Sequence, residues 1–260
     1  MEIMALVLLF IVGACFGSFL CCQARRLHLK GKKLGRRSVC LNCKKQLKWY
    51  DNIPIISWLV LKGKCRKCGK KIGATEILSE FGLGLTFFLF GLGAITNNLT
   101  LNIFLPEQPI IFVFLAILFF LVLSLAFLAI YDGLYGELPV PFLIIAIILA
   151  IFMNFYNFSW QAIGNAALSA LILGGLYLLL YLVSKGKWVG DGDWLLGLSI
   201  GLALGSPWLA LLTLFLSNLL ACLVMLPKTK GKNKRIPFGP FLVSAFIIIY
   251  SFSELLLSMI

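Results

Sequence analysis

The sequence predicts an all-α protein that crosses a membrane about eight times and carries a small cysteine-rich loop domain. Of the 260 residues, 61% are hydrophobic, and the mean hydropathy of +1.00 is high for a soluble domain. The apolar residues form long runs of helical length, and most charged residues lie between these runs. Four cysteines form two C-x2-C pairs in the most polar part of the chain.

A helical bilayer span needs ~20 mostly apolar residues, and the chain has eight candidate runs. The first, residues 3–24, has no basic residue before it and no small-residue cleavage site after it, so we expect a retained membrane helix. The other runs are 77–95, 110–131, 140–155, 162–184, 194–204, 208–226 and 241–259. The run 194–204 is short for a span, at about 17 Å, and Gly205-Ser206-Pro207 ends it.

The positions of the basic residues predict the orientation in the membrane. All 23 Lys and Arg lie within residues 25–71, 185–187 and 228–235. With eight spans these stretches fall on one side of the membrane, which the positive-inside rule identifies as cytoplasmic, and both termini face outward. The net charge of +13 then reflects topology. We therefore expect membrane lipid as a partner and no nucleic acid.

The four loop cysteines predict a metal site. Cys40-x2-Cys43 and Cys65-x2-Cys68 have a spacing close to that of a four-Cys zinc site. Their loop has few apolar residues, so a metal ion would supply a cross-link that its small core cannot. Disulfides are the alternative, and a reducing cytoplasm disfavours them. We expect one structural zinc ion bound by these four cysteines.

Carboxylates at the ends of apolar runs raise a functional hypothesis, because ionisable groups are costly in a membrane. Those at the expected cytoplasmic ends are Asp132, Glu137, Asp191 and Asp193. Taken singly, Asp132 fits a turn and Asp193 fits a helix N-cap. Taken together, two aspartates at one membrane depth can share a proton and activate water for attack on a peptide carbonyl. The pair Asp132 and Asp193 is therefore a candidate catalytic dyad.

An ordered series of motifs, running nearly end to end, resembles the type IV prepilin peptidase family. The motifs are Gly17-Ser18-Phe19-Leu20, Trp49-Tyr50-Asp51-Asn52-Ile53-Pro54, Cys65-Arg66-Lys67-Cys68-Gly69, Asp132-x5-Leu138-Pro139, Gly190-x-Gly192-Asp193 and Ile236-Pro237-Phe238-Gly239-Pro240-Phe241. The chain departs from the family pattern at Leu195, where Lys is usual, and at Cys21, where Asn is common.

The resemblance implies an aspartic endopeptidase of the bacterial cytoplasmic (inner) membrane. Such an enzyme cleaves the short basic leader of type IV pilin-like precursors at the cytoplasmic face, and its two catalytic aspartates map to Asp132 and Asp193. Many family members with the four-Cys loop also methylate the new N-terminus with S-adenosylmethionine. For this chain, the methyl transfer and its cofactor rest on the resemblance alone.

We expect three parts: a first transmembrane helix (1–24), a zinc-binding loop domain (25–76) and a transmembrane aspartic peptidase domain (77–260). Two other functions fit parts of the pattern. A transporter would use the two aspartates as an ion relay, but it would favour internal repeats and a site at mid-membrane. A non-catalytic membrane anchor would present the zinc loop to a partner, and it would leave the carboxylate pair unexplained.

Overall fold

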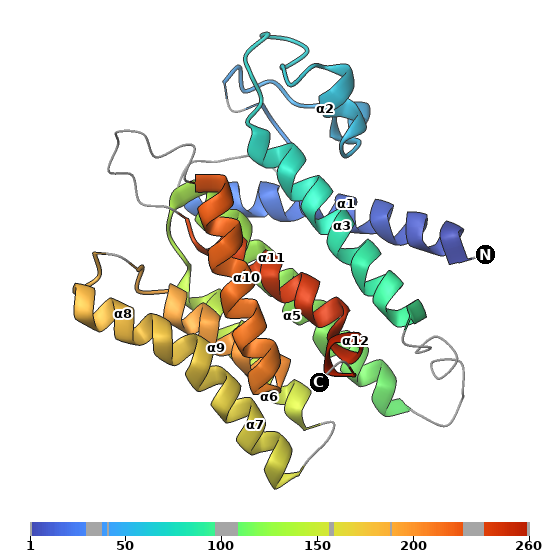
Figure 1. The fold of residues 1–260 in the computed structure, drawn as a ribbon. Coiled ribbons are helices and arrows are strands. Elements are labelled where there is room, and N and C mark those ends of the chain that lie inside the picture. Colours follow the sequence, from blue (N-terminus) through green and yellow to red (C-terminus); the bar gives the residue numbers. More distant parts are fainter. Residues whose placement is uncertain are drawn as a thin grey trace. The chain divides into compact units, whose positions relative to one another are not determined.

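A computed structural model describes residues 2–29, 38–40, 42–96, 109–155, 159–187, 189–225 and 237–258. Within these ranges the chain is helical apart from turns and two isolated bridges, Val39–Gln46 and Lys64–Lys71, and it has no sheet. The predicted all-α fold is confirmed. The elements (Figure 1) are α1 (Glu2–His28), η1 (Trp49–Asn52), α2 (Ile56–Val60), α3 (Ala74–Thr96), α5 (Pro109–Tyr135), α6 (Val140–Asn154), α7 (Trp160–Ala170), η2 (Leu171–Gly175), α8 (Leu176–Ser184), α9 (Asp193–Leu204), α10 (Pro207–Met225), α11 (Gly239–Ser251) and α12 (Ser253–Leu257).

Five helices among the described residues are long and apolar enough to cross a membrane. They are Glu2–His28, Ala74–Thr96, Ile111–Tyr135, Trp160–Ser184 and Pro207–Met225, and shorter apolar helices cover Val140–Asn154, Asp193–Leu204 and Gly239–Ser251. The chain is therefore a multi-pass membrane protein. Within the described residues, each of the eight expected apolar runs is largely helical, and the number that crosses the bilayer stays a prediction.

Several helices extend beyond their apolar runs. The first continues past Ala24 to His28 and carries Arg25, Arg26 and His28 in its last turn. Basic side chains there interact favourably with the negative end of the helix dipole. The long side chains of Arg25 and Arg26 can also pack their methylene groups against apolar surface while the charged group reaches water. Helix α5 also continues past its apolar run, through Asp132 to Tyr135.

The chain divides into two compact units, an N-terminal unit (Met1–Leu92) and a C-terminal unit (Gly93–Ile260). The N-terminal unit contains α1, the cysteine-rich segment and most of α3. The division expected from the sequence, at residues 24 and 76, concerns functional roles and stays a prediction.

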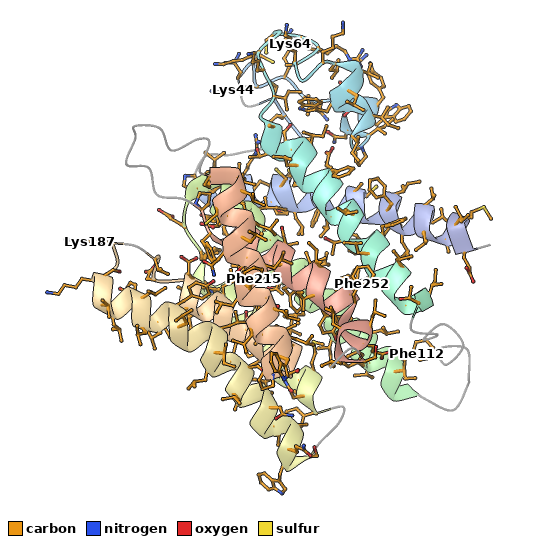
Figure 2. All side chains as sticks on the ribbon, in the orientation of Figure 1. Lys44, Lys64, Phe112, Lys187, Phe215 and Phe252 are labelled. Atoms are coloured by element: carbon orange, nitrogen blue, oxygen red, sulfur yellow. The ribbon has the colours of Figure 1, made fainter. Side chains whose placement is uncertain are left out.

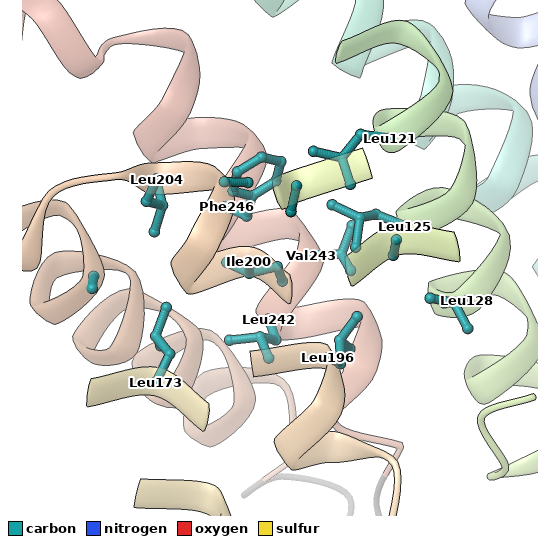
Figure 3. Packing of buried hydrophobic residues seen from close by; sticks show 14 of the residues in the cluster. Leu121, Leu125, Leu128, Leu173, Leu196, Ile200, Leu204, Leu242, Val243 and Phe246 are labelled. Atoms are coloured by element: carbon teal, nitrogen blue, oxygen red, sulfur yellow. The ribbon is translucent and has the colours of Figure 1, made fainter. Parts of the chain in front are cut away.

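The C-terminal unit is built around the short helix α9. This helix packs against α6, α7, η2 and α11, and its Leu196 and Ile200 are fully buried. Figure 3 shows them among Leu121, Leu125, Leu173, Leu242, Val243 and Phe246. Because protein encloses α9, its length need not match the bilayer. It ends at Leu204, where Gly205 adopts a left-handed φ of 63°, and α10 begins at Pro207.

The outward surfaces of the long helices are apolar. Phe112 on α5 is 58% exposed and Phe215 on α10 is 67% exposed, as the labelled side chains in Figure 2 illustrate. Lys187, beyond the end of α8, extends away from that helix in the same view. Exposed aromatic side chains on long apolar helices are typical of a lipid-facing surface.

Candidate functional site

The four cysteines predicted as metal ligands lie together in the N-terminal unit. The Sγ atoms of Cys40, Cys43, Cys65 and Cys68 all lie within 4.8 Å of one another, and those of Cys40 and Cys68 are 3.9 Å apart. A tetrahedral zinc ion with bonds of about 2.3 Å places its sulfur ligands about 3.8 Å apart. The four cysteines are free thiols, and the cluster could bind a metal ion.

The two C-x2-C pairs have the same backbone geometry. The Lys44 N–H donates to the Cys40 carbonyl at 2.8 Å, and the Gly69 N–H donates to the Cys65 carbonyl at 2.9 Å. Lys44 and Gly69 each follow the second cysteine of a pair and have left-handed φ values of 54° and 67°. Each pair is thus a tight turn that directs two thiols to one point, which is how C-x2-C sequences hold a metal.

Cys68 has the environment of a thiolate. Its thiol accepts hydrogen bonds from the Lys70 backbone N–H and the Asn42 side-chain amide, which lower the pKa of Cys68 to about 6. The Asn42 Nδ2 atom lies 3.6 Å from the sulfur. Because the thiolate is the form that binds metal, this environment suits a ligand role.

A cavity of about 750 Å³ lies in the N-terminal unit, beside the cysteine cluster. Its lining includes Trp58 and Ser57 of α2, the carboxylates Glu76 and Glu80 of α3, and Arg25 of α1. Arg25 and Glu76 form an ion pair at 3.0 Å. A volume of this size falls in the range of small-molecule sites, roughly 300–1,000 Å³. The cavity therefore has the size and the mixed polar and aromatic lining of a ligand site.

Of the two predicted aspartates, Asp132 lies in the last turn of α5 and is 5% exposed. It is therefore helical and not the turn residue that its Asp-Gly sequence allowed. Its Oδ2 atom accepts a hydrogen bond of 2.8 Å from the backbone N–H of Gly239, the first residue of α11. A carboxylate is favourable there because the first N–H groups of a helix lack intrahelical partners.

Asp193 is the first residue of α9 and is 8% exposed. The sequence also allowed an N-cap role, but the N-cap residue is Gly192, and the Asp193 side chain does not cap α9. Instead its Oδ2 atom accepts a hydrogen bond of 2.9 Å from the backbone N–H of Gly190. The carboxylate is thus held by the loop that precedes its own helix.

The fold brings the two aspartates into one region of the C-terminal unit. Their carboxylates are close enough to interact electrostatically, and α11 packs against both α5 and α9. The segment that follows α5 and the loop that precedes α9 also touch. A Cβ atom at Gly192 would lie 2.6 Å from the Cβ atom of Leu138, so a larger residue than glycine cannot fit there without displacement. Two motifs that are separate in sequence therefore form one site.

The other two carboxylates at these helix ends are exposed. Glu137 follows α5, and Asp191 lies in the loop before α9. Asp191 interacts electrostatically with Asp193. Neither residue shares the burial of Asp132 and Asp193, so the structure separates a buried pair from an exposed pair. The catalytic roles stay a prediction.

Two residues near the pair had no assigned role in the sequence. Gly239 belongs to the motif Ile236-Pro237-Phe238-Gly239-Pro240-Phe241, and only the fold places its N–H on Asp132. Tyr177 is 3% exposed, its ring packs 5.2 Å from that of Phe238, and it interacts electrostatically with Asp193. Asn218 lies 3.5 Å from the Tyr177 hydroxyl. A tyrosine and an asparagine within apolar runs were the available signal for this contact.

Fold and site together define a multi-pass helical membrane protein with a four-Cys metal-binding cluster and a buried pair of aspartates. Residues 11–93 match the family described as the bacterial peptidase A24 N-terminal domain. Nearly all of the matched stretch lies within the N-terminal unit that holds the cysteine cluster. No solved structure matches the chain.

Three curated relatives named prepilin leader peptidase/N-methyltransferase illustrate the similarity. The protein of Dichelobacter nodosus is 32% identical over 209 residues, which cover 80% of this chain and 68% of that protein. The protein of Bacillus subtilis is 28% identical over 264 residues, 97% of this chain and 96% of that protein. The protein of Myxococcus xanthus is 44% identical over 82 residues, 32% of this chain and 24% of that protein. The chain belongs to the prepilin leader peptidase/N-methyltransferase family and is an enzyme of the peptidase class.

Proposed function

We propose that this enzyme cleaves the leader peptide from type IV pilin-like precursors, with Asp132 and Asp193 as the catalytic pair. The supporting observation is the burial of two carboxylates that approach each other from α5 and α9 and are each held by a backbone N–H. A buried ionisable pair in a membrane protein is costly and is seldom kept without a function. The names of the relatives support the choice of substrate.

The chemistry proposed for the pair is water activation. One aspartate is ionised and takes a proton from a water molecule, while the other is protonated and donates its proton to the scissile carbonyl oxygen. The water oxygen bonds to the carbonyl carbon and forms a tetrahedral intermediate. The C–N bond then breaks as the leaving nitrogen receives a proton, which gives a carboxyl and an amine product. One negative charge is shared by the pair throughout.

We also propose that the bound metal is zinc and that its role is structural. Four thiolates with approximately tetrahedral spacing suit zinc better than calcium or magnesium, which prefer oxygen ligands. When bound, the ion would cross-link the two C-x2-C turns. The first cysteines of these turns, Cys40 and Cys65, are 25 residues apart in the sequence. The ion would thereby stabilise the part of the cavity lining that these cysteines form.

The second proposed activity is methylation of the new N-terminus with S-adenosylmethionine as methyl donor. The cavity in the N-terminal unit supports this proposal by its size and by its lining. Glu76 and Glu80 are candidates to interact with the cationic parts of the donor, and Trp58 is a candidate to pack against its aromatic or sulfonium group. The activity in the relatives' names supports the choice of donor chemistry.

The proposed location is the bacterial cytoplasmic (inner) membrane, with the aspartate pair at the cytoplasmic face. The basic stretches, including Lys185 and Lys187 after α8, support this side. In functional terms we propose a first transmembrane helix (1–24), a zinc-binding loop domain (25–76) and a transmembrane peptidase domain (77–260).

A cleavage assay tests the proposal. Purified full-length protein is mixed with a precursor that has a basic leader, then Gly and Phe, then an apolar helix, and the products are identified by mass. We expect cleavage after the Gly. If no precursor of this design is cleaved while the protein moves ions across vesicle membranes in an Asp132-dependent way, the transporter alternative replaces the peptidase.

A further inference from the structure

The contact between Asp132 and Gly239 links two helices that are far apart in the chain. The two residues are separated by 107 positions, and α11 begins at Gly239. The N-cap residue of α11 is Phe238, and no side chain at that position caps the helix. Asp132 therefore accepts from one of the first N–H groups of α11, which have no intrahelical partner.

The second observation is steric. A Cβ atom at Gly239 would lie 2.8 Å from the Asp132 Oδ2 atom, 3.3 Å from its Cβ atom and 3.4 Å from its Cγ atom. The φ angle of Gly239 is not positive, so residues other than glycine can also adopt its backbone conformation. What requires glycine here is the space that the carboxylate occupies.

A third observation concerns the oxygen atoms. Gly239 holds Oδ2 of Asp132, and Gly190 holds Oδ2 of Asp193 at 2.9 Å. Among the described residues, no donor contacts the Oδ1 atom of either aspartate. Each carboxylate thus has one oxygen bound to a glycine N–H and one oxygen left for a water molecule, a shared proton or a substrate.

We propose that Gly239 is a positioning residue of the catalytic centre: its N–H fixes one oxygen of Asp132, and its missing side chain leaves room for that carboxylate. The inference rests on the proposed function of Asp132 and Asp193. In this arrangement the start of α11 sets the orientation of Asp132 toward Asp193. A shift of α11 would therefore change cleavage without any change in either aspartate.

Two variants separate the parts of this inference. Gly239→Ala adds a Cβ atom that displaces the Asp132 carboxylate. An ester analogue, with glycolic acid incorporated at position 239 by nonsense suppression, replaces the N–H by oxygen and adds no side-chain atom. Gly164→Ala in α7 is the matched control, because a Cβ atom there meets nothing within 4 Å.

Full-length variants are compared with wild type on the precursor described above, by kcat, KM and pH dependence. Loss of a hydrogen bond to a charged group lowers a rate by about tenfold or more. We expect kcat to fall about tenfold for both position-239 variants, with KM within about twofold. Their pH–rate profiles should be displaced from that of wild type, whereas the Gly164→Ala profile superimposes on it.

The outcomes are distinct. If both position-239 variants cleave like wild type, or if the ester analogue alone does, the positioning role of the N–H is wrong. If Gly239→Ala does not fold, as judged by thermal unfolding of the detergent-solubilised protein, the ester analogue decides. If Asp132→Asn and Asp193→Asn both keep activity, the proposed function fails, and this result does not depend on position 239.

Discussion

Glu80 of α3 accepts a hydrogen bond of 2.7 Å from the backbone N–H of Ile55. Ile55 has a φ of 62°, a conformation that is unfavourable for a β-branched residue. It immediately precedes α2, whose Ser57 and Trp58 line the cavity of the N-terminal unit. Glu80 is 8% exposed. A buried carboxylate thus stabilises a strained turn at the cavity wall.

The first prediction follows from this contact. Glu80→Ala leaves the Ile55 N–H without its acceptor, at a cost of roughly 1–3 kcal/mol, so the turn should relax and the cavity wall should move. We expect methylation of the cleaved product, measured by mass, to fall at least about fivefold, while leader cleavage stays near wild type.

Glu80→Gln is the conservative variant, because its amide oxygen can still accept the hydrogen bond, and it should keep more methylation than Glu80→Ala. Glu254→Ala, at an exposed position of α12, is the control. Unchanged methylation in Glu80→Ala, in a protein that methylates at all, would separate this turn from the second activity.

The second prediction concerns the aspartate pair. Asp132→Asn and Asp193→Asn keep the side-chain size and remove the carboxylate, so each should lower cleavage by at least roughly 1,000-fold. The double variant should be no worse than either single variant, because the two residues act as a unit. Initial rates of precursor cleavage at equal protein concentration give the comparison.

Asp191→Asn and Glu137→Gln are the matched controls for the pair. Both residues lie at the same helix ends but are exposed, so both variants should keep substantial activity. An inactive Asp191→Asn beside an active Asp193→Asn would mean that the wrong member of the Gly190-Asp191-Gly192-Asp193 loop was chosen. Activity in both Asp132→Asn and Asp193→Asn would rule out the aspartic mechanism.

The third prediction concerns the metal. Purified protein should contain about one zinc ion per chain, and the double variant Cys40→Ser/Cys43→Ser should contain none, because two of the four ligands are lost. Residues 40–70 should then become more sensitive to protease. Metal analysis by mass spectrometry and limited proteolysis test both points.

Cys15→Ser/Cys222→Ser is the control for the metal, since these two cysteines are exposed and outside the cluster. It should keep the zinc. A wild-type protein without zinc, and with the four loop cysteines paired as disulfides, would contradict the metal site and also the proposed cytoplasmic location of the loop.

The fourth prediction concerns topology. Reporter fusions after Lys71, Lys187 and Lys232 should report the cytoplasm, and fusions at Asn98 and Ser159 should report the exterior, because of the positive-inside rule. Asn98 and Lys232 lie outside the described residues. Reporters at Lys71 and Asn98 on the same side would mean that the helix between them, α3, does not cross the membrane.

Much of the fold could be predicted from the sequence because it depends on local properties. Long apolar runs predict membrane helices wherever they occur in a chain, and the described part of each of the eight runs is largely helical. The cysteine cluster has two ligand pairs, each within four residues, so spacing alone predicted its members. Burial costs for ionisable groups also identified Asp132 and Asp193 as candidates.

The surroundings of those candidates depend on packing between distant segments, and local pattern carries little information about it. The N–H that holds Asp132 belongs to a residue 107 positions further along, in α11, whereas the sequence suggested only a turn for Asp132. The enclosure of α9, which explains its short length, requires other helices, among them α6, α7 and α11, to surround it.

The sequence by itself therefore determined the membrane class, the members of the four-Cys cluster and the two candidate aspartates, because hydropathy and cysteine spacing act over a few residues. Only the tertiary structure decided which backbone groups hold the aspartates, that Glu80 supports the turn at Ile55, and that a cavity lies beside the cysteines. A hydrogen bond or a cavity between separate elements exists only once helices pack in one particular arrangement, and that arrangement is set by the summed contacts of the whole core.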